Sequence, residues 1–167
     1  MNPVHWHLLL NHLPVIGTIL GVLLLAWGTI RKSEEVTQAS LGLLVIAAVL
    51  AIPTFLTGEP AEEVAEHLPG VTKAIIERHE DIARIALILT ELTGVIALTG
   101  LFLRQRARWL VPMALVFGLI AAGAMGYAAN LGGQVRHTEI RAEGTATTMG
   151  GEVQRRLEEK KEHEAKE

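Results

Sequence analysis

The amino-acid sequence predicts an all-α integral membrane protein. We expect a four-helix bundle in up-down-up-down order, with a short helical outer loop and a polar C-terminal tail. Half of the 167 residues are hydrophobic and the mean hydropathy is +0.34, which is too apolar for a soluble domain of this length. The charged residues lie between four long stretches that are almost free of charge. Each stretch approaches the ~20 residues that cross a ~30 Å hydrocarbon core. A soluble bundle would instead carry charged residues along an outer face of every helix.

The four predicted spans form a membrane domain over residues 1–135. They cover about residues 8–30, 37–57, 83–103 and 109–131. The first span lacks a basic leader and a small-x-small cleavage site before Arg31, so we expect it to be retained rather than removed as a signal peptide. Between Ile85 and Leu103 the third span contains a single charged residue, Glu91.

Two tight turns and one longer loop join the spans. The tight turns are residues 31–38 and 104–108, whereas residues 58–84 form an acidic connection. This connection has helical periodicity on both sides of Pro69–Gly70, and its second half is predicted to run directly into the third span. Residues 136–167 form a polar tail, whose mixed charges at helical spacing are typical of a solvated helix or a disordered arm.

Basic residues in the short loops predict the orientation in the membrane. The two tight turns contain the basic residues Arg31, Lys32, Arg104, Arg106 and Arg108. The residues before the first span contain none, and acidic residues dominate the 58–84 connection. We therefore expect a multi-pass protein of the bacterial inner membrane, with its tight turns in the cytoplasm. Both termini and the acidic connection would then lie on the outer, periplasmic side.

Composition excludes several classes of function. The net charge of −3 gives no basic face for nucleic acid. The absence of cysteine excludes disulfides, thiolate zinc sites, Cys-ligated iron–sulfur clusters and covalent c-type haem. A cofactor must therefore be held by histidine, carboxylate or backbone groups. No nucleophilic triad or phosphate loop is recognisable, so we expect an electron carrier or accessory subunit rather than a stand-alone enzyme.

The histidines all fall on the outer side in this topology. His5 and His12 are seven residues apart, which is two helical turns, so they share a face of the first helix. His12 begins the apolar run, where an imidazole is costly unless it faces the bundle interior and has a partner. His7 points roughly the opposite way, and we expect it to anchor the helix in the headgroup region beside Trp6.

Two more histidines lie at the outer ends of later spans. His79 precedes the third span, which runs parallel to the first, and His137 follows the fourth. Imidazoles that project from different helices into one bundle ligate b-type haem or build histidine-rich metal sites. The predicted ligands are His5, His12, His79 and His137. They would hold one or two b-type haems or, in the alternative, copper or zinc at ~2 Å. A third reading is a structural subunit whose histidines only form hydrogen bonds.

Other polar and small residues fit this reading. Arg136 could pair with a haem propionate. Gly132–Gly133 is expected to end the last helix, because glycine commonly follows a helix end. Gly17-x-x-x-Gly21 is an ordinary close-packing motif of membrane helices that could also make room for a macrocycle. Glu91 could be neutral and form a hydrogen bond with Thr90, Thr93 or a neighbouring helix, or it could relay protons.

Four sequence segments resemble a known family. HWHLLLNHLP at the N-terminus, TFLTGEP, HEDIARIAL and ANLGGQVRHTEI look like the bacterial four-span membrane family catalogued as domain of unknown function twenty-two thirty-one. The matching positions are His5 or His7, His12 with Pro14, Thr57–Gly58, His79, Gly132–Gly133 and His137. The resemblance covers roughly residues 1–140. This sequence has His12-Leu13-Pro14 where the family usually has His-Phe-Pro.

The resemblance also implies a function. Relatives of this kind occur joined to Rieske or c-type cytochrome domains, which implies a place in membrane electron transfer with b-type haem. The expected partners are membrane lipid and membrane or periplasmic redox proteins such as a c-type cytochrome or a Rieske protein. A homo-oligomer is a further expected assembly, and nucleic acid is not an expected partner.

Overall fold

A computed structural model describes residues 3–67, 70–103 and 108–137. Within these residues the chain is helical and contains no strand. The helices are α1 (Pro3–Leu10), α2 (His12–Arg31), α3 (Glu34–Leu56), α4 (Gly58–Ala65), α5 (Lys73–Leu103) and α6 (Leu110–Arg136). This part of the chain contains four helices that are long and apolar enough to cross a membrane. The predictions of an all-α chain and four such helices are therefore confirmed. The polar tail from residue 138 and residues 104–107 of the second turn lie outside the described residues.

The first apolar stretch is interrupted between α1 and α2 at Asn11. The cause is Pro14, which has no N–H to donate to the carbonyl of Leu10 one turn earlier. The Thr54 hydroxyl of α3 lies 2.8 Å from the Leu50 carbonyl of its own helix and 3.3 Å from this freed carbonyl. A side chain of α3 therefore replaces a backbone bond that α2 cannot make.

The turn between α2 and α3 is tight and well capped. Lys32 ends α2 in a left-handed conformation, with φ of 53°. The Ser33 hydroxyl then accepts a hydrogen bond from the Val36 N–H at 3.4 Å, and Glu34 and Glu35 occupy the first turn of α3. An N-cap hydroxyl and acidic residues at a helix N-terminus both stabilise the start of a helix.

The second half of the acidic connection is continuous with the third span, as the sequence predicted. α5 runs without a break from Lys73 to Leu103. The expectation that Gly132–Gly133 ends the last helix is wrong, because α6 continues through both glycines to Arg136. Its backbone N–H and C=O groups stay paired there, and the site below shows that Gly132 serves a different purpose.

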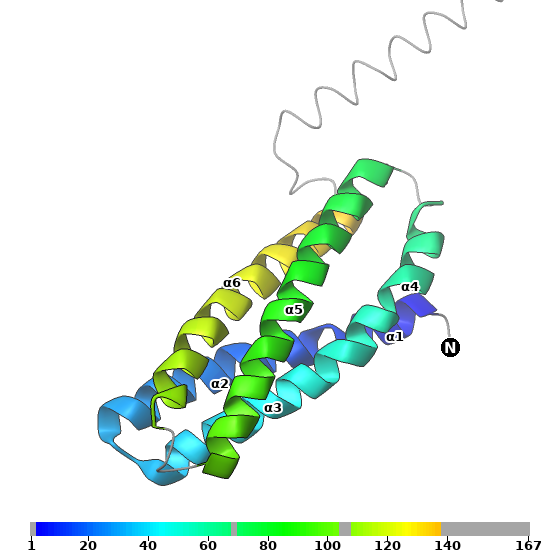
Figure 1. The fold of residues 1–167 in the computed structure, drawn as a ribbon. Helices are drawn as coiled ribbons and strands as arrows, with labels where there is room; N and C mark the ends of the chain where they lie inside the picture. The colour runs from blue at the N-terminus through cyan, green and yellow to red at the C-terminus, as the bar shows by residue number, and fades with distance from the viewer. Residues whose placement is uncertain (1–2, 68–69, 104–107, 138–167) are drawn as a thin grey trace, which may run out of the picture.

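The helices pack side by side into an elongated bundle (Figure 1). The α2–α3 turn and the neighbouring ends of α5 and α6 lie at one end, which we call the turn end. The histidine end comprises α1, α4, the first turns of α5 and the last turns of α6. The main apolar core lies toward the turn end and consists of Val22, Leu25, Leu41, Leu44, Ile96, Ala97, Leu110 and Ala114. A second, smaller cluster of buried residues consists of Ala51, Ala86 and Met125, and Ile76 and Leu131 are buried closer to the histidine end.

Candidate functional site

His79 is held in one orientation at the histidine end. Its Nδ1 lies 2.9 Å from the carbonyl oxygen of Ala128 on α6. Because a carbonyl oxygen only accepts, Nδ1 carries the proton and donates it. The other ring nitrogen, Nε2, is then the unprotonated one in a neutral imidazole, and it has no hydrogen bond within the described part of the chain. A main-chain carbonyl that fixes Nδ1 in this way is the usual support of a histidine that ligates a metal through Nε2.

Gly132 provides the surface on which the His79 ring lies. A Cβ atom at Gly132 would be 3.0 Å from Cε1 of His79, 3.4 Å from Nδ1 and 3.6 Å from Nε2. These three distances place the glycine backbone against the ring, and the closest is too short for a side chain to fit without a shift. The glycine in α6 therefore allows α5 and its imidazole to approach.

Burial keeps the His79 imidazole neutral. His79 precedes the uncharged stretch of α5, and its surroundings include the charged side chain of Glu80. Loss of hydration lowers the pKa of His79 below its usual value of 6.5, although the hydrogen bond to Ala128 and the negative charge of Glu80 oppose this shift. At neutral pH the ring is therefore uncharged, which is the form that binds metal ions.

His7 is the second half-buried histidine at the histidine end. Its Nδ1 lies 3.1 Å from the carbonyl oxygen of Thr54 and 3.3 Å from the hydroxyl of Thr57. The ring is half-buried, and a Cβ at Gly58 would lie 3.8 Å from its Cε1. His7 is also close enough to His79 for the two rings to interact electrostatically. His7 is therefore tied to the end of α3.

The structure does not bring the four predicted ligands together. His5 and His12 are exposed, and the His12 Nδ1 bonds only one turn back, to the Leu8 carbonyl at 3.0 Å. His137 is exposed directly after α6. Arg136 is the last residue of α6, and its side chain lies outside the described part of the structure. Among the described residues no three or more His, Cys, Asp or Glu side chains are grouped to hold a metal ion.

A seven-residue spacing in the sequence indicates that His7 lies on the buried face of its helix. His7, Pro14, Gly21 and Gly28 are each seven residues apart and therefore share one face over two-turn steps. Pro14, Gly21 and Gly28 are all buried in the bundle. His79 has the same relation to the buried residues Ala86, Thr93 and Gly100 of α5. The shared face of His5 and His12 was recognised correctly, but it is the exposed face of the helix.

Acidic side chains surround the histidine end. Burial raises the pKa of Glu62 on α4, and the negative charges of Glu80, Glu66 and Glu59 raise it further. Glu80 belongs to α5, so negative charges of α4 and α5 repel each other at this end. Arg84 partly offsets it through an ion pair with Glu80, whose N–O distance is 2.6 Å.

Arg78 forms a second polar contact between α5 and α6. Its guanidinium donates to the hydroxyl of Tyr127 at 2.6 Å and lies 5.9 Å from the centre of that ring. Further along α5, one carboxylate oxygen of Glu91 is buried and has no hydrogen-bond partner among the described residues. Thr90 and Thr93 donate instead to carbonyls of their own helix, so neither makes the bond to Glu91 that the sequence allowed.

The site therefore offers two imidazoles from separate helices, each with its Nδ1 engaged by an oxygen of a neighbouring helix. Such nitrogens can ligate haem iron, copper or zinc through Nε2. Comparisons of the chain with protein-family models, with curated proteins and with solved structures find no match.

Proposed function

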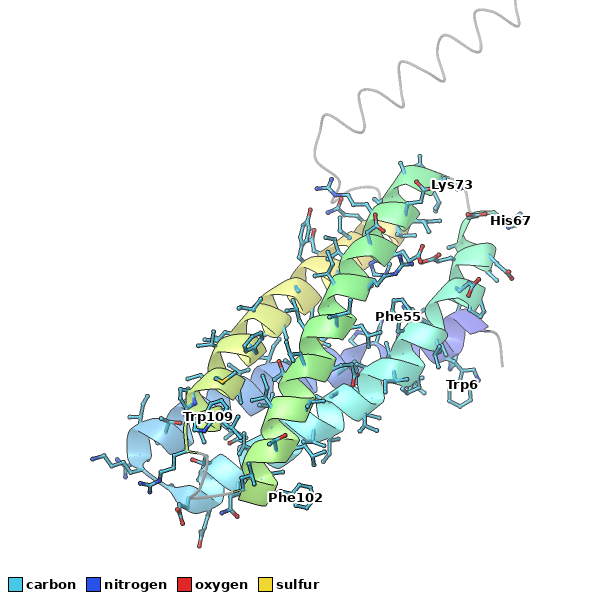
Figure 2. The ribbon with its side chains drawn as sticks, in the orientation of Figure 1. Trp6, Phe55, His67, Lys73, Phe102 and Trp109 are labelled. Atoms are coloured by element: carbon cyan, nitrogen blue, oxygen red, sulfur yellow. The ribbon has the colours of Figure 1, made fainter. Side chains whose placement is uncertain are left out.

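We propose that the chain is a multi-pass protein of the bacterial inner membrane with its four long helices in up-down-up-down order. Large apolar side chains on the outside of the bundle support this placement, among them Leu23, Val95 and Phe102. Trp6 and Trp109 lie near opposite ends (Figure 2), as tryptophans do at the two interfaces of a membrane. The basic tight turns would face the cytoplasm, and both termini would lie on the periplasmic side.

In this membrane the protein acts as a b-type cytochrome-like electron carrier or subunit. The observation that carries this proposal is the His79 imidazole, which is neutral, fixed through Nδ1 by the Ala128 carbonyl and packed flat on Gly132. Haem b, when bound, supplies reversible one-electron chemistry. His79 would hold the haem iron through Nε2, while the Ala128 carbonyl keeps its ring in one orientation and Gly132 covers one side of it. One haem is favoured over two, because His7 and His79 are the only half-buried histidines among the described residues.

The electron partner is a protein on the periplasmic side, such as a c-type cytochrome or a Rieske protein. The acidic side chains of α4 and of the start of α5 would steer a basic partner to the histidine end. His5, His12, His137 and Arg136 remain candidates for further contacts with haem or with a partner.

A reduced-minus-oxidised absorbance spectrum of the detergent-purified full chain tests this function, together with haem extraction. Haem must be available during expression. A sharp α band from extractable haem b is the expected result. A featureless visible spectrum after hemin addition would overturn the cytochrome proposal. Elemental analysis would then separate a copper or zinc protein from a structural subunit without metal.

A further inference from the structure

We propose that Arg78, Tyr127 and Asn130 bind the phosphate of an anionic phospholipid on the outer surface of α5 and α6. The ligand is a phosphodiester whose headgroup carries a net negative charge, such as phosphatidylglycerol. This inference rests on the proposed membrane placement and does not depend on haem. The surface is separate from the His79 ring, which faces the carbonyl of Ala128.

The first argument is the charge of Arg78. Its side chain is exposed and forms no ion pair with any residue that the structure describes. The other lysine and arginine side chains of α5 each have a carboxylate nearby. Lys73 lies 3.9 Å from Glu77. Arg84 lies 2.6 Å from Glu80. Arg78 therefore keeps a positive charge that no carboxylate in the described part of the chain neutralises.

The second argument is an excess of hydrogen-bond donors beside this charge. Arg78 donates one N–H to the Tyr127 hydroxyl oxygen at 2.6 Å, which leaves the hydroxyl proton without an acceptor among the described residues. The Asn130 side-chain oxygen accepts from Gln134 at 2.6 Å, and the Asn130 amide nitrogen has no acceptor in this part of the chain. Tyr127 and Asn130 are exposed and three residues apart, so they lie on one side of α6. Phosphate oxygens accept hydrogen bonds and carry negative charge, so they match both the donors and the guanidinium.

The third argument is the depth of this surface in the proposed membrane. Tyr127 lies near the end of the predicted span 109–131, and Arg78 lies two helical turns before the stretch from Ile85 that contains only one charged residue. The Arg78 guanidinium lies 5.9 Å from the centre of the Tyr127 ring, so the two helices place these side chains at one level. Tyrosine is enriched at the level of the lipid headgroups, and the long arginine side chain reaches the same level. The donors therefore lie where the phosphates of the bilayer lie.

The fourth argument favours a phospholipid over a free phosphate ion. Toward the middle of the predicted span, the side of α6 that carries Tyr127 continues with the exposed residues Gly126, Gly123, Ile120 and Leu119. A Cβ at Gly123 or Gly126 would meet no atom within 4 Å, so the helix surface next to Tyr127 is open. An acyl chain can lie along this apolar surface while its phosphate contacts Arg78. A free phosphate ion would use only the polar part of the same surface.

The test measures lipid binding to the delipidated full-length protein in detergent by native mass spectrometry. Phosphatidylglycerol is compared with phosphatidylcholine of the same acyl chains, whose headgroup has no net charge, and the protein should prefer phosphatidylglycerol. Arg78→Gln should weaken phosphatidylglycerol binding by roughly tenfold, because it removes the charge that strengthens the hydrogen bonds to phosphate. Tyr127→Phe keeps the ring but removes the hydroxyl, and it should weaken binding by roughly threefold.

Two further variants of α5 serve as controls. Arg84→Gln removes the same charge from an exposed arginine that already pairs with Glu80, and it should leave the affinity for phosphatidylglycerol nearly unchanged. Asp81→Asn should instead strengthen binding, since Asp81 is exposed one turn after Arg78 and its negative charge repels a phosphate. Size-exclusion chromatography and circular dichroism of each variant separate a lost contact from a lost fold.

The outcomes separate the lipid site from the proposed function. Equal losses in Arg78→Gln and Arg84→Gln, or equal binding of the two lipids, would overturn the site. Displacement of phosphatidylglycerol by millimolar inorganic phosphate would identify a site for the free ion and overturn the lipid as its ligand. Carbonate extraction of the expressing membranes tests the placement: a released protein contradicts the placement and the site together. A retained protein that binds no phosphatidylglycerol overturns the site alone and leaves the cytochrome proposal to its own spectrum.

Discussion

The two ends of the bundle differ in the side chains that join their helices. At the turn end, large aliphatic residues such as Leu25 and Leu44 are buried among α2, α3, α5 and α6, and glycines let the helices approach closely. Toward the histidine end, Ile76, Ala128 and Leu131 are buried, and side chains of histidine and threonine also form hydrogen bonds to main-chain carbonyls of other helices. The comparison teaches that both ends bury apolar side chains, whereas the side-chain hydrogen bonds between helices described above lie at the histidine end.

The largest expected effect is a cavity at the turn end. Leu25 is completely buried, so Leu25→Ala should lower the free energy of unfolding by about 2–4 kcal/mol through lost packing contacts. Thermal or denaturant unfolding in detergent, followed by circular dichroism, measures this loss. Leu23→Ala is the matched control on the same helix, because Leu23 is 60% exposed. Similar losses in both variants would contradict the assignment of the main core to this end.

The close approach of α2 and α3 provides the next effect. A Cβ at Gly28 would lie 2.9 Å from the backbone nitrogen of Thr37, so the Gly28→Ala variant must shift one helix. We expect a loss of about 1–3 kcal/mol in unfolding free energy. At Gly42 no atom lies within 4 Å of such a Cβ, and Gly42→Ala should stabilise α3 by roughly 0.5–1 kcal/mol. Opposite signs for the two variants in one unfolding assay would confirm the contact.

At the histidine end a similar change should affect binding more than stability. Gly132→Ala would press a methyl group against the His79 ring and turn it away from the Ala128 carbonyl. On the proposed function, hemin affinity should fall by roughly tenfold, as it does when a supporting group of a ligand is lost. Gly123→Ala on the same helix meets no atom within 4 Å and should bind hemin normally. Unchanged affinity in Gly132→Ala would show that the His79 orientation is unimportant.

The smallest effect concerns charge. The pKa of Glu62 is raised by burial and by nearby carboxylates, so its ionised form is less favourable in the folded protein than in the unfolded chain. Its contribution to stability is therefore greatest below the usual pKa of 4.5 and is lost as the pH rises through the folded value. Glu62→Gln should raise the unfolding midpoint slightly at pH 7, and the gain should disappear on acidification below about pH 4.5. Glu63→Gln changes an exposed neighbour and should show less gain at pH 7.

Much of the helical architecture was predictable because apolar length alone determines it. The charge-free stretches predicted four long helices, and the periodicity after Pro69–Gly70 predicted the extension of α5 toward its start at Lys73. The passage of α6 through Gly132 was not predictable from local preference, since glycine usually ends helices and here a contact with His79 gives it another role. Composition cannot reveal such a contact between distant segments.

Which histidines face the bundle interior was not predictable from the spacing of His5 and His12 alone. Counting seven residues from His5 to His12 correctly identified a shared face, but that count gave no information on which face is buried. The buried face follows from Gly21 and Gly28, whose close contacts with α3 fix the rotation of α2. Counting back in steps of seven residues from Gly28 and Gly21 through Pro14 leads to His7. Small residues that allow helix contact were therefore the better guide to the inward histidine.

The bond from Thr54 to the Leu10 carbonyl has a consequence for the order of assembly. In a lipid environment an unpaired carbonyl is costly, and the residue that relieves this one is encoded 44 positions later. In the proposed membrane, the Leu10 carbonyl would lack this partner until α3 lies beside α1. On the proposed membrane placement, insertion of α1–α2 together with α3 as a hairpin would keep this carbonyl paired, and these helices would then mature as one unit.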